Sequence, residues 1–410
     1  MSQYLDSGRA FAPALPMRFS SRLQWDLPAN RLAEALEARR RAGAEILDLT
    51  QSNPTHAGFS YPQEIREALA DPSVMRYDPD PAGTLEARRA VSAYYAERGA
   101  EAPPERILLA SSTSEAYAWL FKLLCDPADE VLAPRPSYPL FEFLAGLEAI
   151  RIVQYPLLYE GRWQVDLEAL QRAVTPRTRA VIVVHPNNPT GSLIQPPELD
   201  SLAALCAERG LALISDEVFS EFPLAPAAAP IATLSQREDV LVFSLNGLSK
   251  TAGLPQMKLA WILTGGPAPL RRRALERLEL IADTYLSVGT PVQRALPRLM
   301  KAAGAVRSQI GQRVRDNFAR LGTLLGSASP LEVLRADAGW YAVLRAPRTR
   351  SEEQWCLELL ERCGVLVQPG YFYDFTEEAY LVVSLLTPPA VFQTGIGRLI
   401  EFASGDQREG

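Results

Sequence analysis

Lysine is scarce in this 410-residue chain, although positive charge is not. Among its 42 Lys and Arg residues only four are lysines, Lys122, Lys250, Lys258 and Lys301. Arginine cannot replace an amine that must lose its proton and condense with a carbonyl. A strand-end lysine is often only a solvated charge, but Lys250 follows an apolar run, 239–243, and lies in a loop of small residues. Scarcity and loop context therefore favour a Schiff-base lysine at position 250.

Cysteine is equally sparse, and its spacing argues against a CxxC redox site and against a cysteine metal site. Cys125, Cys206, Cys356 and Cys363 form no CxxC pair and no metal-ligand spacing. We therefore expect reduced, mostly buried thiols, a cytoplasmic location and no metal site.

Long apolar runs and basic stripes are absent as well. The sequence has no secretory signal pattern and no run of about 18 apolar residues, so we expect neither secretion nor membrane spanning. The net charge is −6, and arginines are scattered among acidic residues. This pattern argues against nucleic acid as a main partner.

The chain has the length and the 47% hydrophobic content for a large core and two domains. From Arg106 onward strands alternate with helices, which predicts right-handed crossovers and a mostly parallel sheet flanked by helices. The strands are predicted at 107–110, 130–133, 151–157, 179–184, 211–215 and 239–244, followed by an apolar run at 257–264.

After Gly265 long helices and antiparallel strands predict a smaller α+β domain. The expected boundaries are 1–45 for an N-terminal segment packing with the small domain, 46–290 for the large domain and 291–410 for the small domain.

Polar residues follow several of the predicted strands, where ligands bind in parallel sheets. Ser111–Glu115 offers hydroxyls and free N–H groups at a helix start, suited to an anion, although Ser and Thr cap most helices. The turn 185–191 would hold the Asn188 amide rigidly. Asp216 ends a very apolar strand and needs a cationic partner, such as a protonated pyridine nitrogen, because an unpaired buried acid is costly. Tyr138 is either a stacking ring or part of the core.

Three short motifs follow one another along the chain, and their order is specific: Asn188-Pro189-Thr190-Gly191, Asp216-Glu217-Val218 and Ser249-Lys250. Together they resemble the class I/II aminotransferases of fold type I, the aspartate aminotransferase superfamily, over roughly residues 45–400. The resemblance implies a large domain that binds pyridoxal 5′-phosphate (PLP) and a smaller α+β domain. It also implies a ping-pong exchange of an amino group between an amino acid, or another amine, and a keto acceptor.

By position, the resemblance assigns roles to single residues. Lys250 would form the Schiff base and carry the substrate's proton, Asp216 would pair with the pyridine nitrogen, and Asn188 would donate to O3′ of PLP. The remaining cofactor contacts would be Tyr138 on the ring face and Ser112, Thr113, Ser114 and Lys258 at the phosphate. Tyr77 resembles the tyrosine that reaches a neighbouring subunit's phosphate, which implies a homodimer with shared sites. Ser52 falls where the family's backbone meets the substrate carboxylate.

Four positions depart from the family pattern. Phe219 replaces a tyrosine that donates to O3′, Gly247 replaces a serine at the phosphate, and Lys258 replaces an arginine. Val382 stands where an arginine would bind the substrate's α-carboxylate, so the substrate either lacks that group or meets another donor. Arg22, in a segment that tends to fold across the site in this family, is the candidate donor, and a surface arginine is the alternative.

Two other functions share these residues. A lyase, decarboxylase or oxidase reaction could run on the same scaffold. A non-catalytic PLP-binding sensor would need an attached DNA-binding module, for which residues 1–45 are too short and insufficiently basic.

Overall fold

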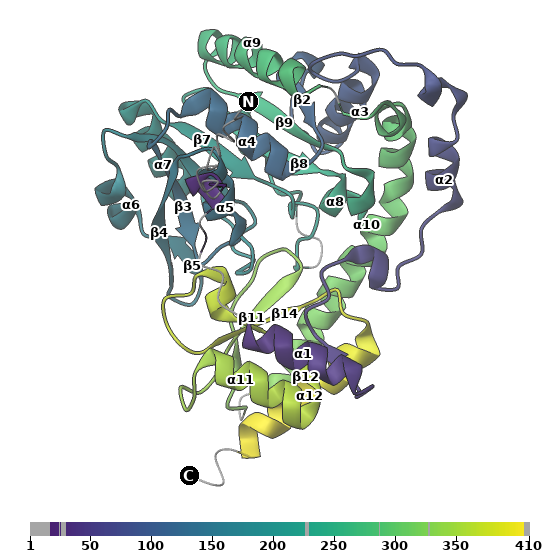
Figure 1. The fold of residues 1–410 in the computed structure, drawn as a ribbon, viewed down its shortest axis with the longest axis vertical. Helices are drawn as coiled ribbons and strands as arrows, with labels where there is room; N and C mark the ends of the chain where they lie inside the picture. The colour runs from purple at the N-terminus through teal and green to yellow at the C-terminus, as the bar shows by residue number, and fades with distance from the viewer. Residues whose placement is uncertain are drawn as a thin grey trace, which may run out of the picture.

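An eight-stranded sheet forms the centre of the larger part of the molecule (Figure 1). The computed structural model describes residues 17–23, 25, 30–225, 229–286, 288–326 and 329–405. In spatial order the strands are β2 (Ile107–Ala110), β9 (Ala260–Gly265), β8 (Val242–Gly247), β7 (Ala212–Asp216), β6 (Thr178–Val184), β3 (Glu130–Arg135), β4 (Arg151–Tyr159) and β5 (Trp163–Val165). Only β9 and β5 run against the direction of the other strands. The predicted mostly parallel sheet is confirmed.

Helices cover both faces of this sheet because its strands are apolar on both faces. One face packs against α4 (Thr113–Leu124), α5 (Leu140–Leu147) and α9 (Ala268–Tyr285). The opposite face packs against α6 (Leu167–Ala173) and α7 (Pro196–Arg209), and beside them against α3 (Leu85–Ala96). The short helices α2 (Gln63–Leu69) and α8 (Leu248–Thr251) complete this part of the chain. The alternating pattern did not reveal α2 or the three-residue strand β5.

The smaller part of the molecule contains the predicted antiparallel strands. Its sheet has the order β10 (Glu332–Val333), β11 (Tyr341–Arg345), β14 (Tyr380–Ser384) and β13 (Gln368–Pro369). A separate pair joins β1 (Leu47–Asp48) to β12 (Val365–Leu366). The helices here are α11 (Glu352–Glu358) and α12 (Pro389–Gly405), and the long α10 (Thr290–Leu325) packs against α2, α3 and α12.

The N-terminal segment contacts both parts. The Asn30 side chain caps α1 (Arg31–Arg41), and Arg31 pairs with Glu353 of α11 at 2.9 Å. Earlier in the segment, the guanidinium of Arg22 donates to the carbonyl of Leu147 in α5 at 3.0 Å. The part of residues 1–45 that includes 1–16, 24 and 26–29 lies outside the described residues.

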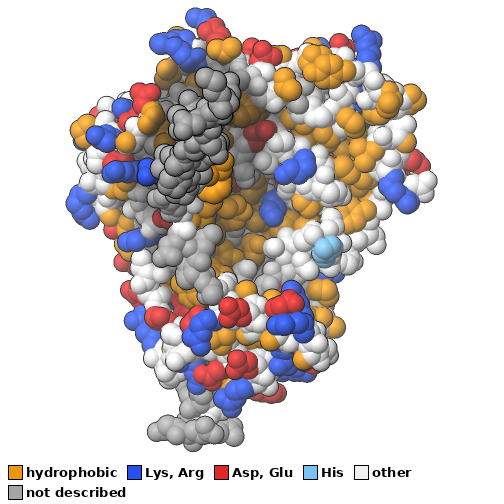
Figure 2. All heavy atoms as spheres, in the orientation of Figure 1, with side chains coloured by type: hydrophobic (Ala, Val, Ile, Leu, Met, Phe, Trp, Pro, Cys, Tyr) orange, Lys and Arg blue, Asp and Glu red, His pale blue; other side chains and the backbone are white. Residues whose placement is uncertain are grey.

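Two further features bear on the predicted partners. None of the helices in the described ranges combines the length and apolar character needed to cross a bilayer. On the face drawn in Figure 2, basic side chains are interspersed with acidic ones. On this face the pattern differs from the basic stripe typical of nucleic-acid binding.

Candidate active site

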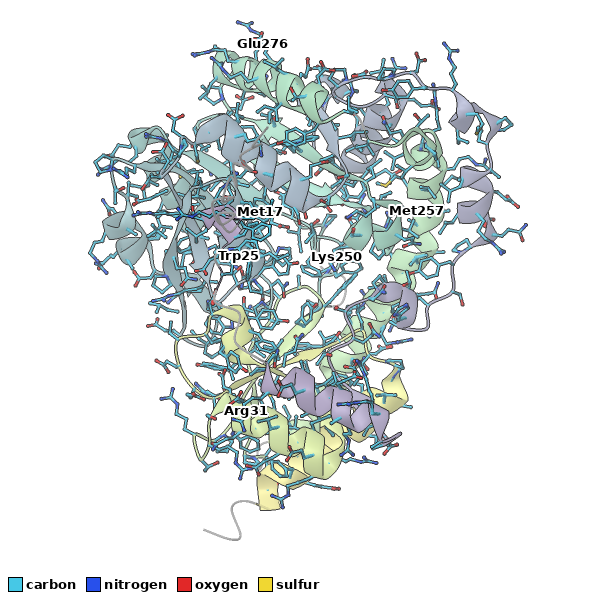
Figure 3. The ribbon with its side chains drawn as sticks, in the orientation of Figure 1. Met17, Trp25, Arg31, Lys250, Met257 and Glu276 are labelled. Atoms are coloured by element: carbon cyan, nitrogen blue, oxygen red, sulfur yellow. The ribbon has the colours of Figure 1, made fainter. Side chains whose placement is uncertain are left out.

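A cavity of about 370 Å³ lies at the edge of the large sheet where its parallel strands end. Strands β2, β3, β6, β7 and β8 all deliver their carboxyl ends to this edge, and β9, which runs the other way, begins there. The lining includes Ser52, Ser112, Thr113, Ser114, Tyr138, Asn188, Asp216, Phe219, Gly247, Lys250, Lys258 and Tyr341. Most site residues that the sequence analysis singled out therefore meet in one cavity. Figure 3 places Lys250 where the two parts of the molecule meet.

Lys250 is held by the short helix that follows β8. The Asn246 side chain accepts the backbone N–H of Gly247 at 2.7 Å and the Thr251 hydroxyl at 2.6 Å, and donates to the carbonyl of Glu217 at 3.1 Å. Asn246 thereby ties the lysine-bearing helix to the turn after β7. Burial lowers the pKa of Lys250 to about 8, although the charge of Asp216 raises it. An amine with this pKa is partly neutral, and so nucleophilic, near neutral pH.

Asp216 ends β7 beside this lysine. Its carboxylate accepts the hydroxyl of Tyr117 at 3.1 Å and the backbone N–H of Val218 at 3.3 Å. Burial raises the pKa of Asp216 to about 6, against the lowering effects of both hydrogen bonds and of Lys250. A cationic ligand would relieve this burial penalty. Tyr117 could not be identified from the sequence, where its only signal is its position about one turn after Thr113 in the helix.

The loop after β6 is clamped by Asn187 rather than by Asn188. The amide of Asn187 donates to the carbonyl of Pro136 at 3.1 Å and to the Thr190 hydroxyl at 2.8 Å, and accepts the Ser137 hydroxyl at 3.1 Å. Asn188 is left to line the cavity, and its buried Oδ1 has no partner among the described residues. The predicted turn thus brings Asn188, whose amide oxygen lacks a partner in the described chain, to the wall of the cavity.

The other end of the cavity suits an anion. The Ser112 hydroxyl caps α4 by accepting the N–H of Glu115 at 3.1 Å, and Thr113 and Ser114 line the cavity from the first turn. A helix start presents free N–H groups and a partial positive charge. Lys258 lies beside it with φ of +49°, so its backbone is in the left-handed region.

Gly247 stands where the family resemblance leads one to expect a serine, and close packing explains the difference. A Cβ at position 247 would lie 2.9 Å from the Cβ of Ala260 and 3.0 Å from the carbonyl oxygen of Leu259. A side chain therefore requires β9 to move. Glycine lets the two strands approach at the floor of the cavity.

Aromatic residues from both parts of the chain close the cavity. Tyr138, which is 40% exposed, enters from the loop before α5, and the backbone N–H of neighbouring Ser137 donates to the carbonyl of Tyr373 at 2.9 Å. Tyr341 enters from β11. Burial raises the pKa of Tyr341 to about 12, although the hydrogen bond with the Ser52 hydroxyl lowers it. Sequence reasoning missed Tyr341 because its strand is far from the recognised motifs.

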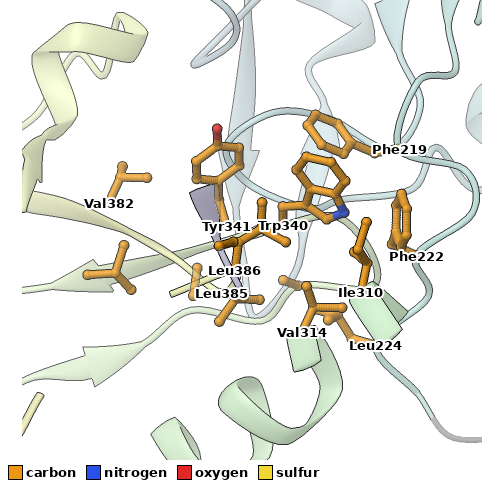
Figure 4. Packing of buried hydrophobic residues seen from close by; sticks show 14 of the residues in the cluster. Phe219, Phe222, Leu224, Ile310, Val314, Trp340, Tyr341, Val382, Leu385 and Leu386 are labelled. Carbon is orange, nitrogen blue, oxygen red and sulfur yellow. The ribbon is translucent and has the colours of Figure 1, made fainter. Parts of the chain in front are cut away.

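Three singled-out residues lie outside this cavity. Tyr77 is 70% exposed. Val382 is fully buried in β14 between Val343 and Gln368, and Figure 4 shows it apart from Tyr341. The Arg22 guanidinium donates to the carbonyl of Leu147, the last residue of α5, and to the Ser20 hydroxyl. The interpretation of Arg22 as a donor in the cavity is therefore not supported by its position, because local carbonyl and hydroxyl acceptors bind its guanidinium.

The lining fits a phosphorylated pyridine aldehyde. Lys250 could supply an amine for the aldehyde, and Asp216 a buried carboxylate that forms no ion pair within 4 Å in the described chain. Asn188 lines the wall with an amide, and the start of α4 with Lys258 suits the phosphate. These are the groups that PLP needs.

Known proteins resemble this chain over nearly its whole length. Residues 44–393 match the family described as "Aminotransferase class I and II". The glutamate–pyruvate aminotransferase AlaA of Escherichia coli is 25% identical, over 95% of this chain and 98% of that protein. An alanine aminotransferase of Mycobacterium tuberculosis is 28% identical, over 92% and 89%. The solved alanine aminotransferase of Pyrococcus furiosus shares the fold with a TM-score of 0.84 at 23% identity, over 95% of this chain and all of that one. The chain therefore belongs to the class I and II aminotransferases of fold type I, enzymes that depend on PLP.

Proposed function

We propose that Lys250 is the lysine that binds the cofactor and moves the proton in this aminotransferase. The observation that carries the proposal is the meeting of Lys250, Asp216 and the start of α4 in one 370 Å³ cavity. The lowered pKa of Lys250 supports both roles, because a group that takes and returns a proton works best with a pKa near the operating pH.

The other residues bind and orient. Asp216 would keep a proton on the pyridine nitrogen, and Tyr117 and Val218 fix its carboxylate. The Asn188 NH2 group would donate to O3′, and Tyr138 would contact the ring. Ser112, Thr113, Ser114 and Lys258 would hold the phosphate. When bound, PLP supplies an electron sink for negative charge at the substrate's Cα.

The substrate enters beside Ser52 and Tyr341. The relatives named for glutamate, pyruvate and alanine support an amino acid as donor and a keto acid as acceptor. Val382 is buried away from the cavity, so we place the substrate's polar groups against the hydroxyls of Ser52 and Tyr341.

The assembly we propose is a cytoplasmic homodimer with shared sites. Met75 and Tyr77 are 87% and 70% exposed, as expected of residues that a second copy would cover. Four free thiols in the described chain support a reducing compartment.

Within each copy we propose a large domain at 46–290 and a small domain at 291–410. For residues 1–45 we keep the expected packing of α1 on the small domain and add the contact of Arg22 with α5.

A panel of amino acids and simple amines, each mixed with the PLP-loaded protein, tests this function. We expect the best donor to convert bound PLP stoichiometrically to pyridoxamine phosphate, with release of the matching keto product. Release of ammonia or carbon dioxide without pyridoxamine phosphate would contradict transamination and favour a lyase or decarboxylase.

A further inference from the structure

Two aromatic rings lie next to the amine of Lys250. Its Nζ is 4.9 Å from the centre of the Trp340 ring and 5.7 Å from the centre of the Phe219 ring. Phe219 follows β7 in the large part of the chain, whereas Trp340 directly precedes β11 in the smaller part. The two parts therefore meet around this one amine.

The Trp340 ring is fixed from several directions. Phe219 and Phe222 pack against it at centroid distances of 5.4 and 5.1 Å (Figure 4). Its backbone carbonyl accepts the N–H of Leu385 at 2.7 Å, and the N–H of Gly339 donates to Phe222 at 2.8 Å. Trp340 is fully buried, and its indole N–H has no partner among the described residues. Since no hydrogen bond to the described chain orients the indole, the orientation of the ring depends on its packing against Phe219 and Phe222.

We propose that Trp340 and Phe219 form an aromatic seat for the Lys250 side chain whenever its amine is free of the cofactor, with Trp340 as a positioning residue. This inference rests on the proposed role of Lys250. A ring face attracts an ammonium group through its quadrupole, most strongly for Trp and in desolvated sites. The seat thus stabilises the protonated amine without a second carboxylate.

The charged and titratable groups around the amine explain why such a seat matters. Asp216 faces the cavity from β7, Lys258 from the turn before β9, Tyr138 from the loop before α5 and Tyr341 from β11. Asp216 is the only acid in the described lining. If the free ammonium relied on Asp216 alone, it would compete with the pyridine nitrogen for that carboxylate. Ring faces offer the amine a position that leaves Asp216 to the cofactor.

The test measures the protonation of Lys250 directly. The protein is loaded with pyridoxamine phosphate, which leaves the lysine free, and treated with an acylating reagent at a series of pH values. Mass spectrometry of the Lys250 peptide gives the labelling rate, whose midpoint reports the pKa of the amine. In Trp340→Leu we expect the midpoint to fall by about 0.5 to 1 pH unit, because the ammonium loses its strongest ring contact.

Three further variants make the outcome decisive. Trp340→Phe should restore most of the midpoint, and Phe219→Leu, which keeps the Trp340 side chain, should lower the midpoint by less. Trp355→Leu removes an equally buried tryptophan whose cation contact is with Arg350, and should leave the Lys250 midpoint unchanged.

An unchanged or raised midpoint in Trp340→Leu overturns the proposal, as does an equal shift in Trp355→Leu. If Trp340→Leu does not fold, the shift in Phe219→Leu decides. The readout is independent of turnover, so a failed transamination assay with a normal Trp340 effect would reject the proposed function and not the seat.

Discussion

Lys250 and Asp216 line one cavity from the ends of neighbouring strands, and burial moves their pKa values towards each other, to about 8 and about 6. An acid and an amine with such pKa values are suited to exchanging protons near neutral pH. In this protein we expect the pair to act through the cofactor between them rather than on each other.

Asp216→Asn should stabilise the cofactor-free protein and weaken cofactor binding. The folded-state pKa of Asp216 is raised above its ordinary value of 3.8 to about 6, so the buried charge costs stability at neutral pH and the cost disappears as pH falls from about 6 to about 4. We expect the variant to gain on the order of 2 to 3 kcal/mol at pH 7 and little near pH 4. Denaturant unfolding of both cofactor-free proteins at several pH values measures this.

The same variant should bind PLP less tightly and lose most of its turnover, because an amide cannot keep the pyridine nitrogen protonated. Tyr117→Phe is the matched control, since it removes one hydrogen bond and keeps the carboxylate. Full activity in Asp216→Asn would show that the carboxylate does not face the cofactor.

Phe219→Tyr should lower the pKa of the imine nitrogen between Lys250 and PLP, which is read from the visible absorbance of the PLP-loaded protein. Phe219 lines the cavity. A hydroxyl at this position would donate to O3′, and O3′ would then stabilise the proton on the imine nitrogen less. We expect a shift of about one unit, measured by titrating the absorbance of both proteins. A midpoint that stays or rises would place the added hydroxyl away from O3′.

Gly247→Ser should destabilise the protein and should not tighten PLP binding. Its Cβ would meet Ala260 at 2.9 Å, and such overpacking typically costs about 1 to 3 kcal/mol. Gly322→Ser, in α10 with no atom within 4 Å of its added Cβ, is the control and should change the unfolding free energy much less. Tighter PLP binding in Gly247→Ser would mean that β9 moves and that the hydroxyl reaches the phosphate.

The sequence predicted the sheet and the residues at its strand ends because both depend on local patterns. Apolar runs define the strands, and parallel strands bring their carboxyl ends, with Asn188, Asp216 and Lys250, to one edge. Tyr341 and Trp340 could not be found in this way, since the packing of the smaller part of the chain brings Tyr341 to the cavity and Trp340 to the Lys250 amine. The position of Arg22 was also beyond prediction, because it depends on a carbonyl of Leu147 more than a hundred residues away.

The lysine that binds the cofactor can be located directly. Borohydride reduction of the PLP-loaded protein, followed by peptide mapping, should fix the cofactor on the peptide that contains Lys250. Lys250→Ala should give no reduced adduct and should lose turnover by several orders of magnitude, while retaining some PLP through the phosphate contacts. An adduct on Lys122, Lys258 or Lys301 would contradict the proposed role of Lys250.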